Sequence, residues 1–286
     1  MICSKMKYQA ILIAAGLALS SGLCHAGVEN DVPSCYGIEG ISVPSPDSQH
    51  ELFLLIDQTT PFDDKLRQSI RENAGRLIVP GASYVVASFS SYGDRRYFEV
   101  ISAGKLESPL TPAQRDSTKR TAIPKFDACM KSQAAYGRKT AATAINKALE
   151  SVSGAIPQSD VASSLQRLAL RVRASKAVDK VVFIASDMLE NSSISSFYAG
   201  PEIRTLQPEQ EIQKFLQKQA VADFGPARVY VLGAGLLAQG KDAQKSYRKP
   251  ETIQALNRFW QLYFSKSQAS LDDFGAPTLV NPITWR

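Results

Sequence analysis

Short runs of consecutive apolar residues alternate along this chain with longer segments in which apolar residues recur every three or four positions. An unbroken apolar run of five or six residues is typical of a strand buried on both faces, as in a central parallel sheet. Strands are predicted at residues 52–56, 84–89, 97–101, 180–185 and 228–232. The second and third of these flank Gly93-Asp94, a pair that predicts a hairpin turn.

The segments with helical periodicity lie between or after these strands. In the first of them, the apolar residues from Leu66 to Leu77 share one face, and Asp63 or Asp64 can cap its start. Pro208 and Pro250 each open a later helix, because proline suits the first helical turn. Two further helices are predicted over residues 140–152 and 160–178.

This alternation of strands and helices predicts an α/β fold. We expect a single doubly wound, mostly parallel sheet flanked by helices in three layers over residues 51–275. Residues 27–50 are rich in Pro, Ser and Gly and indicate an N-terminal lead-in, and residues 276–286 form a C-terminal tail. Residues 104–136 are polar and contain three prolines, and they are interpreted as a long surface insertion.

The first 26 residues have the composition of a secretory signal peptide. Lys5 and Lys7 precede an apolar run of ten residues, which is followed by small residues up to Ala26. Such a run is shorter than the roughly 20 residues that a membrane-spanning helix needs. We expect cleavage near Ala26 and a periplasmic or secreted protein with no stable membrane span after cleavage. A lipoprotein modified at Cys24 or an uncleaved anchor is the alternative.

Charge and histidine content exclude several function classes. Removal of the signal peptide lowers the net charge from +6 to about +4, and no basic cluster is interleaved with aromatic residues as a nucleic-acid groove requires. No nucleic-acid partner is therefore expected. His50 would be the only histidine left, which argues against a multi-histidine zinc site or a histidine-assisted nucleophile.

The two cysteines that remain after cleavage are Cys35 and Cys129. Two cysteines in an exported chain predict one disulfide. Two free thiols are the alternative.

Polar residues follow two of the predicted strands, where an open α/β sheet binds its ligands. Asp57 and Thr59 follow the first strand, Asp187 follows the fourth, and Thr140 opens a predicted helix. Carboxylates and hydroxyls together form an all-oxygen site suited to a hard cation such as Mg²⁺. The simpler interpretation is that these side chains cap helices or hold turns.

These segments resemble the von Willebrand factor A domain and its metal-ion-dependent adhesion site, which uses Asp-x-Ser-x-Ser, a distant Thr and a further Asp. The matching segments are Asp57-Gln58-Thr59-Thr60-Pro61, residues 137–145 around Thr140, and residues 181–187, which end in Asp187. The sequence departs from the family at Pro61, which replaces the second serine, and at Met188, which replaces a glycine. Thr143 fits the threonine position in a different register.

The resemblance implies a protein-binding module rather than an enzyme. A bound Mg²⁺ would leave one position open for a carboxylate of a partner protein, in an envelope, secretion or conjugation assembly. Phe197 and Tyr198 are candidate partner contacts, although packing beneath their loop is the simpler interpretation. The alternatives are a Mg²⁺-dependent phosphatase-like hydrolase, whose second Asp is Thr59 here, and a periplasmic solute-binding protein.

Overall fold

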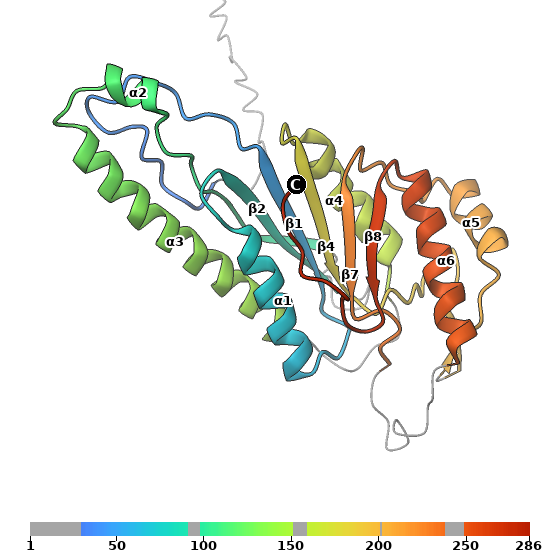
Figure 1. Cartoon of the computed structure of the whole chain (residues 1–286). Helices are drawn as coiled ribbons and strands as arrows, with labels where there is room; N and C mark the ends of the chain where they lie inside the picture. The colour runs from blue at the N-terminus through green and yellow to red at the C-terminus, as the bar shows by residue number, and fades with distance from the viewer. Residues whose placement is uncertain (1–29, 91–97, 151–158, 201, 238–248) are drawn as a thin grey trace, which may run out of the picture.

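A six-stranded, mostly parallel sheet forms the centre of the protein (Figure 1). The computed structural model describes residues 30–90, 98–150, 159–200, 202–237 and 249–286. The strand order is β3-β2-β1-β4-β7-β8, and every neighbouring pair is parallel except β2 with β3. The strands are β1 (His50–Asp57), β2 (Ala82–Phe89), β3 (Phe98–Lys105), β4 (Asp179–Ala185), β7 (Arg228–Leu232) and β8 (Ser270–Gly275). The predicted fold class is confirmed.

Helices cover both faces of this sheet (Figure 1). One face packs against α1 (Asp64–Leu77) and α3 (Ile123–Glu150), and the other packs against α4 (Val161–Ala174), α5 (Pro208–Gln217) and α6 (Pro250–Lys266). Side chains of β1 pack in the cores on both faces of the sheet. Leu52, Leu54 and Ile56 belong to one core, and Phe53 and Leu55 belong to the other. The alternation of side chains along a strand divides them in this way.

Residues 104–136, which are predicted to form a long surface insertion, are mainly helical. They contain the end of β3, the short helix α2 (Pro112–Ser117) and the first half of α3. Helix α2 begins with a capping box formed by Thr111 and Gln114. Helix α3 buries a narrow stripe that includes Gln133, Gly137 and Ala141, so the apolar periodicity of its first half is weak. The helix therefore begins 17 residues before the start at Thr140 that this periodicity predicts.

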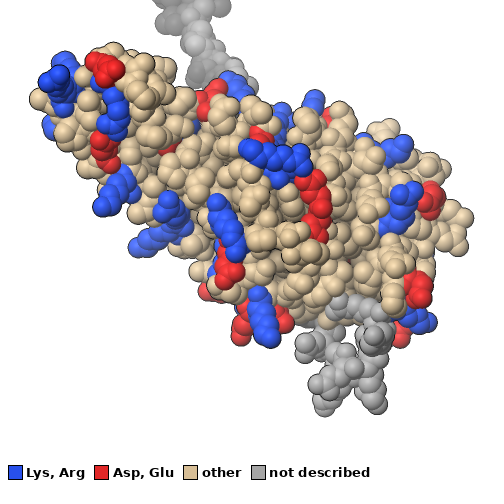
Figure 2. Space-filling view, viewed as in Figure 1, with Lys and Arg blue, Asp and Glu red and all other residues tan. Residues whose placement is uncertain are grey.

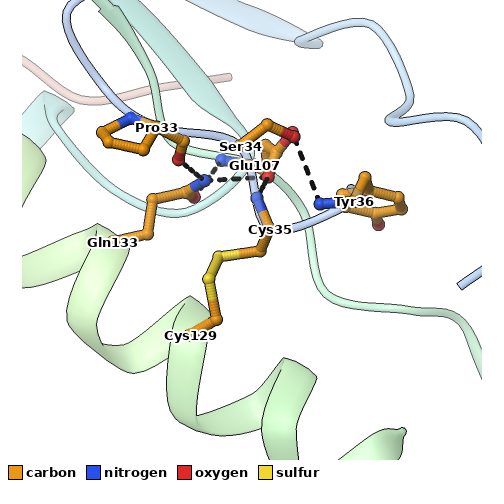
Figure 3. Close-up of a disulfide and its surroundings, with 7 residues drawn as sticks. All are labelled: Pro33, Ser34, Cys35, Tyr36, Glu107, Cys129 and Gln133. Carbon is orange, nitrogen blue, oxygen red and sulfur yellow. Dashed lines mark hydrogen bonds between the residues drawn. A yellow bond between two sulfur atoms is a disulfide. The ribbon is translucent and has the colours of Figure 1, made fainter. Parts of the chain in front are cut away.

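A disulfide joins Cys35 to Cys129, as predicted, and ties the N-terminal lead-in to α3 (Figure 3). Beside it, the buried Glu107 carboxylate accepts hydrogen bonds from Ser34 Oγ at 2.6 Å, Cys35 N at 2.8 Å and Gln133 Nε2 at 2.8 Å. Burial alone would raise the pKa of Glu107, but these hydrogen bonds outweigh it and the pKa is lowered. The lead-in is thus fixed by a covalent bond and by a buried charge with several donors.

Strand β8 and the packing of residues 276–286 were not predicted. Strand β8 lies at the sheet edge and reads Ser-Leu-Asp-Asp-Phe-Gly, which lacks an apolar run. The tail that follows crosses the sheet face (Figure 1) and buries Ile283, whose N–H donates to Asn73 Oδ1 at 3.0 Å. The last residues then reach the ends of the strands where β1 and β4 begin.

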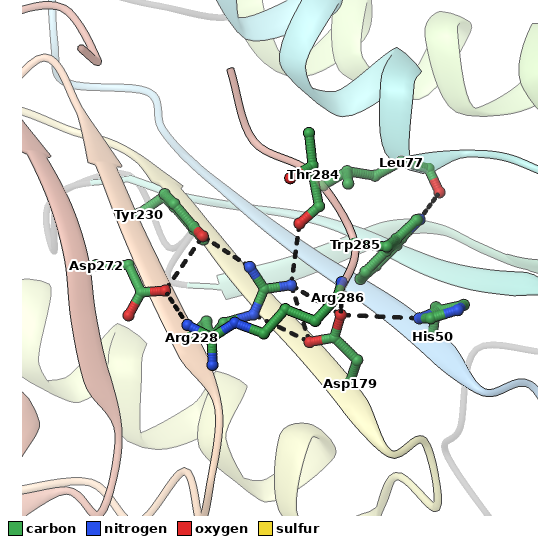
Figure 4. Close-up of polar contacts among 9 residues, drawn as sticks. All are labelled: His50, Leu77, Asp179, Arg228, Tyr230, Asp272, Thr284, Trp285 and Arg286. Atoms are coloured by element: carbon green, nitrogen blue, oxygen red, sulfur yellow. Dashed lines mark hydrogen bonds and ion pairs between the residues drawn. The ribbon is translucent and has the colours of Figure 1, made fainter. Parts of the chain in front are cut away.

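There the tail joins a polar network (Figure 4). The Arg228 guanidinium forms a buried ion pair with Asp179 at 2.8 Å and donates to the Thr284 carbonyl at 3.1 Å. The Trp285 ring stacks on His50 with its centroid 5.0 Å away, and Trp285 Nε1 donates to the Leu77 carbonyl at 3.1 Å. The tail is therefore an integral part of the fold.

The substitution Trp285→Ala is expected to lower the free energy of unfolding by about 2 kcal/mol, because it removes a half-buried ring and a hydrogen bond. Urea denaturation followed by circular dichroism measures the change. Val280→Ala in the same tail is the matched control, since Val280 is 83% exposed. Equal stability of Trp285→Ala and the wild type would show that the contacts of Trp285 add nothing to the stability of the fold.

Candidate functional site

Two buried acidic residues lie together at the edge where the parallel strands β1 and β4 end. Asp57 is the last residue of β1, and Ser186-Asp187 follow β4, which pairs with β1 in register from His50 opposite Asp179 to Ile56 opposite Ala185. The Ser186 hydroxyl donates to Asp57 Oδ2 at 2.7 Å, which links the two strand ends directly. Adjacent parallel strands bring their carboxyl ends to one edge, so this proximity follows from the sheet order.

Asp57 is surrounded by hydrogen-bond donors from its own loop. Its Oδ1 accepts from the Thr59 N–H at 2.9 Å and from the Thr59 hydroxyl at 2.5 Å. Together with Ser186 on Oδ2, these contacts hold the carboxylate in one orientation. Asp57 is 0% exposed and Thr59 is also buried, so this group of oxygens is screened from bulk water.

Asp187 is held by a separate set of contacts. Its N–H donates to Thr60 Oγ1 at 2.9 Å, and its Oδ1 accepts from the Leu189 N–H at 2.9 Å. Its carbonyl accepts from the Gly235 N–H at 2.8 Å, which ties the loop to the end of β7. Thr60 and Ser186 therefore complete the cluster, and their signal in the sequence is a hydroxyl residue within three positions of each acidic residue.

Met188 takes a backbone conformation that favours glycine. Its φ is +58°, in the left-handed region that costs a side chain about 1 kcal/mol or more. Its side chain is fully buried and its carbonyl accepts from Trp260 Nε1 at 3.0 Å. The surrounding packing thus fixes the sharp turn that follows Asp187.

Two negative charges on the buried carboxyls of Asp57 and Asp187 would be unfavourable. Burial raises the pKa of Asp57, although the hydrogen bonds from Thr59 and Ser186 oppose it. Burial and then the nearby charge of Asp57 raise the pKa of Asp187 well above its usual value. Such a pair can be neutralised by a retained proton or by a cation.

Of the two candidate partner contacts, only Tyr198 lies near this pair. Burial and then the charges of Asp187 and Asp57 raise the pKa of its phenol, and its side chain is half-buried in the hairpin of β5 (Tyr198–Ala199) and β6 (Glu202–Ile203). Phe197 is fully buried, with its ring 5.0 Å from that of Phe259. It packs in the core, so its interpretation as a surface contact is corrected.

Thr140 is not placed at a helix start as the sequence prediction required. It lies inside α3, eight residues before Ala148, whose carbonyl accepts from Gln58 Nε2 at 3.5 Å. Eight helical residues rise about 12 Å, so Thr140 sits roughly two turns from the Asp57 loop. Thr143 is exposed on the same helix. The structure brings Asp57, Thr59 and Asp187 together and leaves Thr140 outside this group.

Some of the sequence predictions lie outside the described residues. These are the signal peptide with Cys24 and Ala26, and the turn at Gly93-Asp94. None of the helices that the structure describes is long and apolar enough to cross a membrane. Across the same ranges, no three His, Cys, Asp or Glu side chains gather as a metal-binding group, so a cation at Asp57 and Asp187 would depend on two carboxylates and on hydroxyl oxygens.

Comparison with known proteins assigns no family to this chain. The chain matches no protein-family model, and it has no significant match among curated protein sequences.

Proposed function

We propose that this chain is an exported protein-binding module of the von Willebrand factor A type, which contacts a partner at the carboxyl edge of its sheet. The observation that carries the proposal is the convergence of Asp57 and Thr59, from the loop after β1, with Asp187, from the loop after β4, in one buried cluster of oxygens. The left-handed conformation of Met188 supports it, because the family has a glycine at this position. The disulfide fits an oxidising compartment.

The donor set fits a Mg²⁺ ion in part. Asp57, Thr59 and Asp187 offer hard oxygen atoms. Burial raises the pKa of both carboxyls, and a divalent cation would offset the negative charge that this burial disfavours. Thr140 is not available to complete the set, and Pro61 has no hydroxyl. When bound, the ion would supply an open position for a partner carboxylate, while these residues hold it and exclude water.

Metal binding is tested by thermal unfolding with and without Mg²⁺. The wild type is expected to gain about 2.7 kcal/mol at a Mg²⁺ concentration 100 times its Kd. Asp57→Asn is expected to lose this gain, and Asp116→Asn on the exposed surface of α2 is the matched control. A wild type that is indifferent to Mg²⁺, or an Asp57→Asn variant that responds fully, would contradict the metal site.

Partner binding is tested by affinity purification from the envelope fraction in Mg²⁺ or in EDTA. The proposal expects a protein retained by the wild type in Mg²⁺ and released by EDTA or by Asp57→Asn. Mg²⁺-dependent phosphatase activity that Asp57→Asn abolishes would instead identify the hydrolase. The solute-binding alternative is disfavoured because the described residues form one six-stranded sheet and a small hairpin, whereas two lobes need two sheets.

A further inference from the structure

The positive charge of this protein is concentrated in one segment. Residues 111–150, here called the α2–α3 segment, contain eight basic and three acidic residues, a net charge of +5. The rest of residues 27–286 contains 23 basic and 24 acidic residues, a net charge of −1. The α2–α3 segment therefore accounts for the whole positive charge that remains after the expected removal of the signal peptide.

Most of these cations form no ion pair with an acidic residue that the structure describes. Among the described residues, no ion pair involves five exposed side chains of the α2–α3 segment: Lys119, Arg120, Lys125, Lys131 and Lys139. The ion pairs in the segment are Arg115 with Asp127 and Lys147 with Glu99. Figure 2 shows Lys and Arg side chains along the edge of the molecule that α2 and α3 form, with fewer Asp and Glu side chains among them.

The other basic stretch of the chain, Arg167 to Lys180 on and after α4, differs in this respect. Arg173 pairs with Asp223 at 3.6 Å and Lys176 with Asp47 at 3.9 Å. The Lys180 ammonium donates to the Val172 carbonyl at 3.0 Å. The basic side chains of this stretch therefore mostly contact acidic or carbonyl oxygens of the protein itself, and the stretch is a suitable comparison for the α2–α3 segment.

The α2–α3 segment is also tied to the fold and exposes a single large apolar side chain among its described residues. Helix α3 has 28 residues and spans about 42 Å, and the Cys35–Cys129 disulfide fixes its first half. Tyr136 is the one large apolar side chain among the described exposed ones that lies in this segment. Specific protein interfaces concentrate their energy in several such anchors, whereas spaced cations on a rigid rod suit a diffuse anionic surface.

We propose that the α2–α3 segment docks the protein peripherally on an anionic phospholipid bilayer, with its unpaired lysines and arginines against the lipid phosphates. Each cation near such a surface strengthens binding about fivefold, and the attraction weakens as salt screens it. The binding uses a surface separate from the Asp57 cluster, so it does not depend on the function proposed above. A docked protein would keep the carboxyl edge of its sheet available to a partner.

Co-sedimentation with vesicles tests this proposal. The full chain, purified as the cell processes it, is mixed with vesicles of phosphatidylcholine alone or with added phosphatidylglycerol. The test variant replaces Lys125, Lys131 and Lys139 by Gln, and the control variant replaces Arg167, Arg173 and Lys176 by Gln. Both lose three charges, and all six side chains are exposed. Circular dichroism confirms that each variant is folded.

The wild type and the control variant are expected to bind the phosphatidylglycerol vesicles in low salt, and the test variant to bind about 100-fold more weakly. Equal losses in both variants would show that only net charge matters and would overturn the assignment to the α2–α3 segment. Equal binding to phosphatidylcholine alone would overturn the electrostatic basis. Tighter binding to duplex DNA than to the vesicles, lost in the test variant, would assign the surface to nucleic acid instead.

Discussion

Replacing both Cys35 and Cys129 by serine is expected to lower the free energy of unfolding by about 4–5 kcal/mol. The disulfide closes a loop of 94 residues that contains β1, α1, β2 and β3, so without it the unfolded chain gains much conformational freedom. Cys35 is fully buried, and a serine there would add the cost of an enclosed hydroxyl. Urea denaturation of the double variant and of the oxidised wild type measures the difference.

Reduction of the wild type provides the control for this prediction. With a thiol reductant, the wild type is expected to approach the stability of the Cys35→Ser/Cys129→Ser variant, and the variant itself is expected not to respond. If the variant and the oxidised wild type unfold at the same urea concentration, Glu107 and its hydrogen bonds alone hold the lead-in to α3.

The sheet could be predicted because its inner strands are buried on both faces. The runs 52–56 and 181–185 contain only apolar residues, and they lie within β1 and β4, respectively, at the centre of the sheet. The edge strand β8 and the tail gave no such signal. Strand β8 has two adjacent aspartates between Leu271 and Phe274, so it shows neither an apolar run nor a regular alternation. The tail is held by Ile283 and Trp285 with long-range hydrogen bonds that no local pattern reveals.

Helix α3 shows why polarity was a poor guide to residues 104–136. A helix that packs with one narrow stripe of small residues leaves most of its surface polar, as α3 does around Gly137 and Ala141. A hydrophobic pattern therefore detects only its last part, from Thr140 on. That late start is what placed Thr140 at a helix beginning and hence among the candidate ligands.

The carboxylate pair was accessible to sequence reasoning because it depends on strand ends. Asp57 and Asp187 each follow a strongly apolar run, and parallel neighbours bring such residues together. The orientation of each carboxyl could not be predicted, since it depends on Ser186, Thr60 and Gly235 across loops. The buried position of Phe197 also depends on tertiary packing against α5 and α6.

Glu190 is a buried carboxyl for which sequence reasoning gave no signal. It is fully buried in the loop after β4, and its Oε2 accepts from the Ala162 N–H at 2.9 Å, in the first turn of α4. Its Oε1 has no hydrogen-bond partner among the described residues. Burial, and to a smaller extent the charge of Asp160, raises the pKa of Glu190 to about 8, although hydrogen bonds from Ser192 and Ala162 oppose this.

The raised pKa makes the stability of the fold depend on pH. Between the usual glutamate pKa and about 8, the folded protein keeps a proton that the unfolded chain releases. The stabilisation from Glu190 is complete below the unfolded pKa and is lost as the pH rises through this window. The loss amounts to roughly 1.4 kcal/mol per pH unit, and several kcal/mol over the whole window.

Glu190→Gln removes this titration while keeping an oxygen that can accept from the Ala162 N–H. Urea denaturation between pH 5 and pH 9 is expected to show that the free energy of unfolding of the variant rises relative to that of the wild type as the pH increases. At the upper end the variant is expected to be more stable by several kcal/mol. Glu202→Gln, at an exposed position, is the matched control and should follow the wild type at every pH. A constant difference between Glu190→Gln and the wild type across this range would mean that Glu190 is ionised in the folded protein throughout, and that the N-terminus of α4 stabilises its charge despite burial.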